Sequence, residues 1–255
     1  MLGQMLESAT LVEAKLLLGK LPAFAPVVWR LLDSGPLLAL KVAGREGDRG
    51  LGGGNAMFSR IVTFTGATDV DAGVTYLQDT VVPMLHEQKG FRGVTASADR
   101  ASGVLGVMSL WEAEADRDAS ESTMVKARQG GQRVIGGEVT VEHFEELLAE
   151  LARPPAVGCS LLLQRISMDP AQVEENLDFF RREVLPRMKA SPGFCAVRNM
   201  INRQTGEGMG GSLWADKASM DAWAEAAETL RQQVPRRGVT FGELSRRELV
   251  FVDLR

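Results

Sequence analysis

The chain has 255 residues, of which 45% are hydrophobic and 24% charged, a composition typical of a globular protein. Its formal net charge of −4 excludes the basic surface that nucleic-acid binding requires. The two cysteines, Cys159 and Cys195, lack metal or redox spacing, and the two histidines, His86 and His143, stand far apart. We therefore expect no metal, no cofactor and a cytoplasmic protein.

Residues 1–56 form an N-terminal extension, expected to be helical, without a counterpart elsewhere in the chain. The longest charge-free run, 21–29, is about half of the roughly 18–20 residues that cross a bilayer, so we expect no membrane span. Three interpretations stay open. The extension is a dispensable segment before a natural start at Met57, a helical hairpin covering apolar surface, or a helix that binds a membrane surface or a partner.

One stretch of the sequence occurs twice, at a constant offset of 103 residues and without a gap. A match at a fixed period, with turn glycines in register, indicates a duplicated structural unit. We predict an extension over 1–56 and two repeats over 57–150 and 156–255, joined by a linker with two prolines. The matched residues include Pro83/Pro186, Gly90/Gly193, Phe91/Phe194, Gly103/Gly206 and Trp111/Trp214.

Each repeat begins with a predicted strand and an amphipathic helix. The strands are expected over 58–65 and 159–167, where apolar residues alternate or run together. Both helices carry the same stripe of five apolar positions, which predicts that they bury the same face against a sheet. Pro83 and Pro186 each remove an amide donor, and we expect the helix to bend or end there.

The rest of each repeat reads as a hairpin, a second helix and a final strand. Hairpin loops are predicted, from their composition, at Asp99 to Gly103 and Asn202 to Gly206. The strands that follow these loops are expected to end at Trp111 and Trp214. The second helices are expected over 114–129 and 217–232, and the fourth strands over 138–147 and 244–254.

The predicted fold class is α+β, with two tandem ferredoxin-like (βαββαβ) repeats. A single unit of this kind has helices on one face of its sheet only. Two copies in one chain can bury their bare faces against each other, so we expect them to pack sheet to sheet as an intrachain α+β barrel with small hollows beneath the helices. Further association to a homodimer stays open.

These features resemble the antibiotic-biosynthesis-monooxygenase-like families of the dimeric α+β barrel superfamily. The resemblance rests on the passage from Pro83 into Gly90-Phe91, on the Arg-x-x-Gly hairpin and on Ser-Leu-Trp before an acidic helix, and covers about 57–150 and 156–255. It implies a cavity between sheet and helices in each unit, and in some members oxygenation of aromatic polyketides without metal or flavin. Haem-degrading members carry a histidine in the helix after the tryptophan, which is absent here.

Five residues are candidate ligand contacts, each with a structural alternative. Trp111 and Trp214 can stack on an aromatic ligand, although core packing is the commoner role of such residues. Tyr76 can offer a hydroxyl, but its counterpart Phe179 favours ordinary packing. Arg198 and Asn199 place one polar side chain on each sheet face, where edge-strand solvation is the alternative.

No paired carboxylates, nucleophile motif or phosphate-binding glycine loop is present in the sequence, so no catalytic residue is assigned. His86 suits the negative end of a helix better than a general base. Two functions stay open. The protein is a cofactor-independent monooxygenase acting on a small apolar or aromatic compound, or a non-catalytic ligand-binding or stress-associated protein on the same scaffold.

Overall fold

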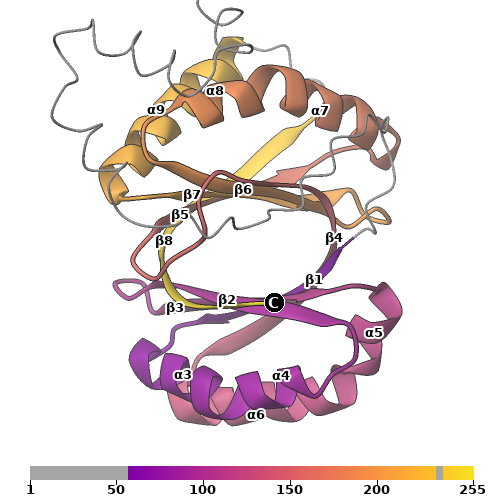
Figure 1. The fold of residues 1–255 in the computed structure, drawn as a ribbon, viewed down its shortest axis with the longest axis vertical. Coiled ribbons are helices and arrows are strands. Elements are labelled where there is room, and N and C mark those ends of the chain that lie inside the picture. The colour runs from indigo at the N-terminus through magenta and orange to yellow at the C-terminus, as the bar shows by residue number, and fades with distance from the viewer. Residues whose placement is uncertain (1–56, 234–237) are drawn as a thin grey trace, which may run out of the picture. The chain divides into compact units, whose positions relative to one another are not determined.

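A computed structural model of the chain describes residues 57–233 and 238–255, which lie in one compact unit (Figure 1). The predicted helical extension over 1–56 lies outside the described residues. Eight antiparallel strands close into a barrel in the order β1-β3-β2-β8-β5-β7-β6-β4. No helix within the described ranges is long and apolar enough to cross a membrane. The strands are β1 Phe58–Thr65, β2 Phe91–Asp99, β3 Val104–Trp111, β4 Glu138–Leu151, β5 Ser160–Ser167, β6 Phe194–Ile201, β7 Glu207–Trp214 and β8 Thr240–Leu254.

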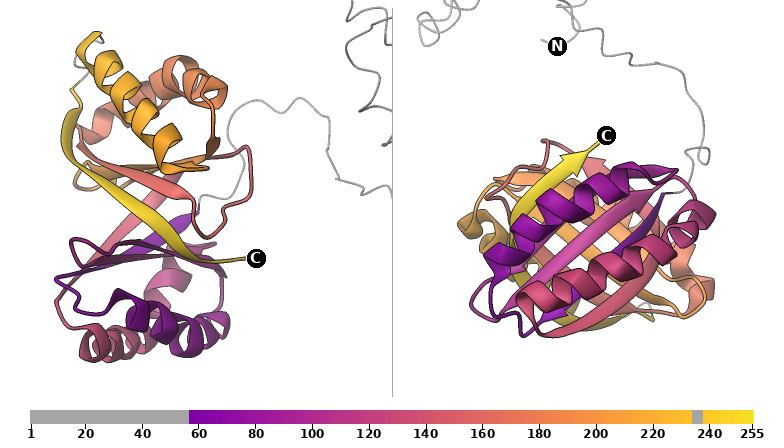
Figure 2. Two further views of the ribbon diagram at one scale, coloured as in Figure 1. Left: turned by 90° about the vertical axis from the view of Figure 1, so that its left-hand side faces the viewer. Right: turned by 90° about the horizontal axis from the view of Figure 1, so that it is seen from below.

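The helices form two layers outside the barrel, one below β1–β4 and one above β5–β8 (Figures 1 and 2). Each half thus has the β-α-β-β-α-β order predicted from the sequence, and the α+β barrel is confirmed. The first half carries α3 Val70–Tyr76, η3 Leu77–Val81, α4 Val82–His86, α5 Glu114–Ala119 and α6 Glu121–Ile135. The second carries η4 Pro170–Gln172, α7 Val173–Phe179, η5 Phe180–Val184, α8 Leu185–Ala190 and α9 Lys217–Gln233.

Strands β4 and β8 are longer than predicted because each serves both halves. Phe58 to Thr65 of β1 pair with β4 up to Glu145, and the rest of β4 pairs with β6 of the other half. In the same way β8 pairs first with β5 and then with β2. The two sheets are therefore joined along their edges, and β8 runs visibly from one half to the other in Figure 2. This closure leaves no free strand edge in the barrel.

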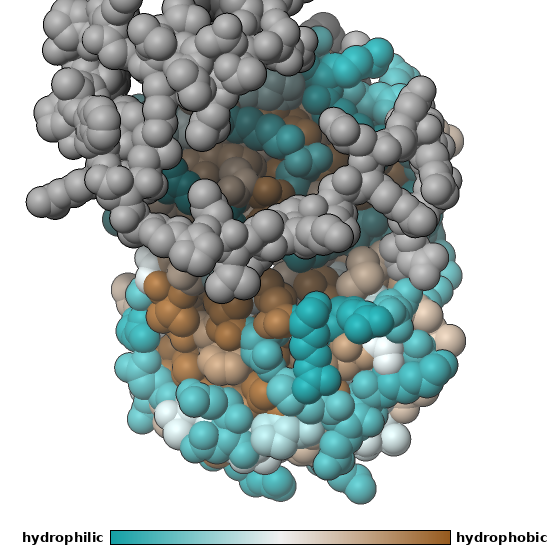
Figure 3. All heavy atoms as spheres, in the orientation of Figure 1, coloured by the Kyte–Doolittle hydropathy of each residue, from teal (hydrophilic) through white to brown (hydrophobic). Residues whose placement is uncertain are grey.

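Apolar side chains fill three layers of the molecule. One cluster lies between β1–β4 and their helices, and another between β5–β8 and theirs. A third fills part of the lumen, where Ile61 and Phe144 of the first half meet Met200 and Met209 of the second. The buried faces of the two sheets thus face each other, as predicted. In the space-filling view, hydrophobic residues of the first half gather between its sheet and its helices (Figure 3).

Of the two outcomes predicted at each proline, a bend or an end, the helix does not end there. A π-helical turn, η3 or η5, precedes Pro83 and Pro186, and the helix continues as α4 or α8 with the proline in its first turn. Because proline lacks an amide hydrogen and its ring crowds the carbonyl one turn earlier, an ordinary α-helical turn is disfavoured there. The wider turn accommodates the ring.

Both predicted hairpins are present. The Asp99 carboxylate accepts hydrogen bonds from the amides of Ala101 and Ser102 and from the Ser102 hydroxyl. Gly103 and Gly206 close the two hairpins with φ angles of 66° and 75°, in the left-handed region that favours glycine.

Candidate functional site

Each half has a cavity between its sheet and its helices, but the two differ in size. The cavity of the second half, which we call the β5–β8 cavity, measures about 250 Å³, and that of the first half about 60 Å³. The presence of hollows beneath the helices agrees with the sequence prediction. Only the β5–β8 cavity offers room for more than a single small ring, since a cavity of about 150 Å³ in another protein holds benzene.

Glycines on β7 account for much of this difference. Gly208 and Gly210 stand 103 residues after Leu105 and Val107, whose side chains pack between the first sheet and its helices. Gly210 lines the β5–β8 cavity, and a Cβ atom built there would lie 3.3 Å from Asn199 Oδ1. The floor of the second half thus lacks two branched side chains that fill the corresponding space in the first.

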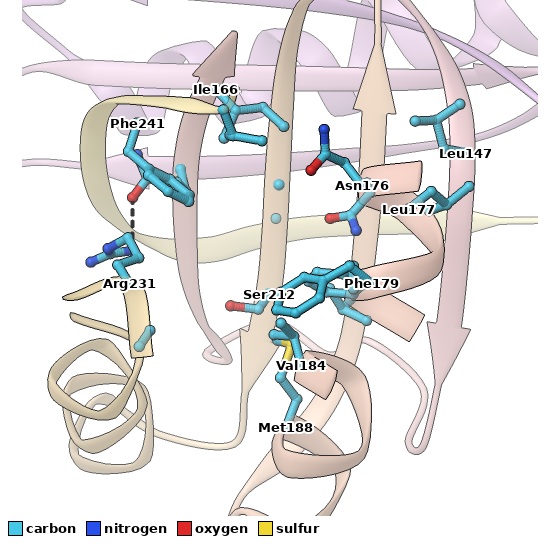
Figure 4. A pocket seen from close by; sticks show the side chains of 18 of the residues that line it. Leu147, Ile166, Asn176, Leu177, Phe179, Val184, Met188, Ser212, Arg231 and Phe241 are labelled. Atoms are coloured by element: carbon cyan, nitrogen blue, oxygen red, sulfur yellow. Dashed lines mark hydrogen bonds between the residues drawn. The ribbon is translucent and has the colours of Figure 1, made fainter. Parts of the chain in front are cut away.

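The wall of the β5–β8 cavity is mostly apolar and comes from both the sheet and the helices. Figure 4 shows Phe179, Val184 and Met188 on the helical side, facing the strand that carries Ser212. Trp223 of α9 also lines the cavity. Among the described lining residues there is no Asp, Glu, His, Lys, Cys or Tyr.

The two tryptophans predicted as ligand contacts lie behind the cavities. Trp111 and Trp214 are fully buried, and neither is among the described residues that line a cavity. Each indole donates a hydrogen bond of 3.0 Å to a serine two residues earlier, Ser109 or Ser212. Trp223 stacks on Trp214 with ring centroids 5.6 Å apart. Trp223 is therefore the indole that a ligand would meet.

The cavity contains a small number of polar groups. Asn199, predicted as a ligand contact, lines it, and its amide makes no hydrogen bond with another described residue. Arg231 donates to Gln164 Oε1 at 3.1 Å, lies over the Phe241 ring and pairs with Glu228 (Figure 4). Asn199 is thus the lining amide without a hydrogen-bond partner among the described residues.

Arg198 and Asn199 point to opposite faces of β6, as alternation requires, but β6 is not an edge strand. It pairs with both β7 and β4, so solvation at an edge does not explain these residues. Arg198 faces the lumen and forms an ion pair with Glu146, whose side chain is 10% exposed. Burial lowers the pKa of Arg198.

In the first half a polar network occupies the space beside the smaller cavity. Arg60 is 2% exposed and donates to Ser120 Oγ at 3.0 Å, to the carbonyl oxygen of Arg117 at 2.6 Å and to His143 Nε2 at 3.4 Å. It also forms an ion pair with Glu121 at 3.1 Å. Burial and the nearby guanidinium groups lower the pKa of His143, which keeps the ring neutral and able to accept.

The second half replaces this network with apolar residues. Strand pairing places Leu162 at the position of Arg60, since Arg60 lies opposite Ser109 and Leu162 opposite Ser212. Trp223 stands 103 residues after Ser120. The two halves therefore share a backbone and differ in the chemistry beneath their helices.

Tyr76 lines the smaller cavity, with its hydroxyl close against Gly130 of α6. His86 ends α4 and lies 2.5 Å from an Asp253 carboxylate oxygen, outside both cavities. Cys159 and Cys195 pack in one lumen cluster, and burial raises the pKa of the Cys195 thiol, with a further contribution from Cys159. Among the described residues, no three His, Cys, Asp or Glu side chains are grouped as metal ligands.

Comparison by sequence finds similar proteins that are uncharacterized. It is 27% identical to the uncharacterized protein Rv2558 of Mycobacterium tuberculosis (strain ATCC 25618 / H37Rv), over 80% of this chain and 88% of that protein. It is 23% identical to the uncharacterized protein Rv2557 of the same strain, over 69% of this chain and 79% of that protein. No family model matches the chain.

Solved structures share the barrel. An anthrone oxidase-like protein superposes with a TM-score of 0.58 at 15% identity, covering 79% of this chain and 94% of that one. The "putative monooxygenase" of Lactobacillus acidophilus NCFM superposes with a TM-score of 0.57 at 12% identity, covering 78% and 96%. The chain therefore shares the α+β barrel fold of these solved structures, as the sequence resemblance predicted. At these identities the likeness establishes the fold.

Proposed function

We propose that the protein binds a small apolar or aromatic molecule in the β5–β8 cavity. The observation that carries this proposal is an apolar cavity of about 250 Å³ with one amide, that of Asn199, free of described hydrogen-bond partners. Ligand sites typically combine apolar walls with a few polar groups that fix orientation. The volume suits a bicyclic compound, and the Asn199 amide can hold a ligand carbonyl or hydroxyl oxygen.

The lining favours binding without catalysis as the first function. General acid–base catalysis needs a titratable side chain within hydrogen-bond reach of the substrate. Arg231 is the one ionisable side chain among the described lining residues, and it is already paired. The described polar side chains that a ligand meets in this cavity are therefore amides, a hydroxyl, the Trp223 indole and the paired Arg231 guanidinium, none of which is a general base.

The second candidate is a cofactor-independent monooxygenase, which the likeness to the anthrone oxidase-like protein favours. With no general base on the described wall, such a reaction requires a substrate that ionises readily by itself, such as an anthrone or a quinol. Asn199 would then stabilise the resulting oxyanion through its amide hydrogen atoms.

The binding experiment uses 2-naphthol and anthrone as probes and the intrinsic tryptophan fluorescence as the signal, because Trp223 lines the cavity. Gly210→Val copies Val107 of the first half, fills the cavity and should weaken binding at least about tenfold, or 1.4 kcal/mol. Gly211→Ala is the matched control: Gly211 also borders the cavity, but its added methyl group would face Leu163 in the lumen. Equal affinity in both variants would refute the proposed site.

Oxygen uptake separates the two functions. Uptake with anthrone that depends on Asn199 identifies the oxygenase, whereas saturable binding without uptake identifies the binding protein. The organisation proposed from the sequence, with repeats over 57–150 and 156–255, is supported by the matching element order of the halves. The π-helical turns at equivalent positions support it as well.

A further inference from the structure

The lumen of the barrel contains a polar niche formed by Ser97, Gly106 and Arg247. The three positions related to these by the pseudo-symmetry of the two halves are apolar. Met200 and Met209 pack with Phe144 in the lumen cluster. Ser97 and Gly106 stand 103 residues before these two methionines and pair with each other across β2 and β3. The counterpart of Phe144 is Arg247, as the strand pairings of the preceding residues, His143 and Arg246, show.

The side chain of Arg247 reaches across β2 to β3 on the lumen side. A Cβ atom built on Gly106 would lie 2.3 Å from Arg247 Nη1 and 3.4 Å from Ser97 Oγ. A larger residue at position 106 would therefore displace the guanidinium. Odd-numbered neighbours on β3, such as Leu105 and Val107, point the other way, toward the helices. The absence of a side chain at Gly106 makes room for the guanidinium in the lumen.

Arg247 forms no ion pair or hydrogen bond with any other residue in the described part of the chain. Burial lowers the pKa of its guanidinium, and the charge of Arg165 adds to this effect, while the charges of Glu243, Asp99 and Glu142 oppose it from a distance. The other lumen arginines are paired, Arg165 with Glu142 at 2.5 Å and Arg198 with Glu146. A half-buried charge with no carboxylate in direct contact is costly, so the niche favours an anion.

Two hydroxyl groups face the same space. Thr63 and Ser97 flank Gly106 in the pairing register of β1, β3 and β2, and their side chains share its lumen face. Both residues are buried, with 9% and 7% of their surface exposed, and neither hydroxyl bonds to another described residue. A guanidinium fork with hydroxyl donors matches the geometry of a carboxylate or phosphate group.

We propose that Arg247, Thr63 and Ser97 form a binding site for a small oxyanion inside the barrel. This site is separate from the β5–β8 cavity, because the lumen and the cavity lie on opposite faces of the strands. Its ligand is a compact carboxylate or phosphate, and binding supplies the counterion that Arg247 lacks.

The test follows the melting temperature while sodium phosphate or sodium acetate replaces sodium chloride at constant ionic strength. The wild-type protein should gain a few degrees in a saturable manner with at least one of the two oxyanions. Comparing the two arms shows whether phosphate or carboxylate is preferred. Arg247→Gln should lose the response and, in chloride alone, should melt at the wild-type temperature or above it, because an uncompensated charge is removed.

Arg246→Gln is the matched control. Arg246 neighbours Arg247 on β8 but bonds to Asp221 on the outer side, at 2.9 Å, so this variant should keep the full response to the oxyanion. A wild-type protein that responds to neither oxyanion would overturn the proposal. An equal response in Arg247→Gln would overturn it as well.

Discussion

Truncation of Arg60 to alanine tests how the first half is held together. The change removes three hydrogen bonds, to Ser120, His143 and the carbonyl of Arg117, each contributing about 0.5–1.5 kcal/mol net. It also leaves a cavity beneath Trp111, whose ring centroid lies 5.7 Å from the guanidinium carbon. Glu121 loses its ion pair with Arg60 but keeps the one with Arg128, so its carboxylate still has a partner. We expect a loss of about 3–5 kcal/mol in the free energy of unfolding.

Urea unfolding followed by far-ultraviolet circular dichroism measures this loss. At about 2–4 °C per kcal/mol for a domain of this size, the melting temperature should fall by about 6–20 °C. Arg60→Leu, which copies Leu162 of the second half, should lose less because the leucine refills part of the volume. Arg246→Ala breaks an exposed pair and should cost at most about 1 kcal/mol. If Arg60→Ala costs no more than Arg246→Ala, the inferred role of the network is wrong.

Three further predictions concern a histidine, a glycine and a cysteine. Because the pKa of His143 is lowered from its ordinary value of 6.5, the unfolded chain binds the proton more readily, so the free energy of unfolding should fall below about pH 6.5. That fall should level off below the folded pKa and be smaller in His143→Gln. Gly206→Ala should lower the free energy of unfolding in urea by about 1–3 kcal/mol, because its Cβ would lie 1.9 Å from the Met168 carbonyl oxygen. Gly158→Ala, which has open space around it, should lower it by less. The raised pKa of Cys195 predicts slow reaction with a thiol reagent at pH 8, and labelling in the native protein as fast as in urea would contradict it.

The order of elements was predictable because each is signalled locally. Gly103 and Gly206 predicted the hairpins because glycine favours the positive φ angles that both residues adopt in the structure. The apolar stripes predicted the buried faces of the first helices. The strand β1 was predicted with the bounds it has, Phe58–Thr65. The π-helical turns escaped prediction because a proline inside a helical pattern usually signals an end, and only the tertiary packing on both sides of it decides otherwise.

The cavity was harder to predict because its volume depends on positions where the second half has glycine and the first half has a larger side chain. Comparing the repeats drew attention to residues they share, such as Trp111 and Trp214, which are fully buried. The informative positions were those where the repeats differ, Leu105 and Val107 against Gly208 and Gly210. The role of Asn199 as a candidate contact was visible from alternation along β6, whereas the placement of Trp223 in the wall required the stacking of α9 on the sheet.

The way β4 and β8 are shared between the halves has a consequence for synthesis of the chain. While the ribosome is still making the second half, the outer edge of β2 and the distal part of β4 lack the strands that later cover them. Unpaired edges of this kind attract strands from other molecules. Placing β6 and β8 on the same polypeptide supplies them at a high effective concentration, so the nascent protein closes on itself before a neighbour can intrude.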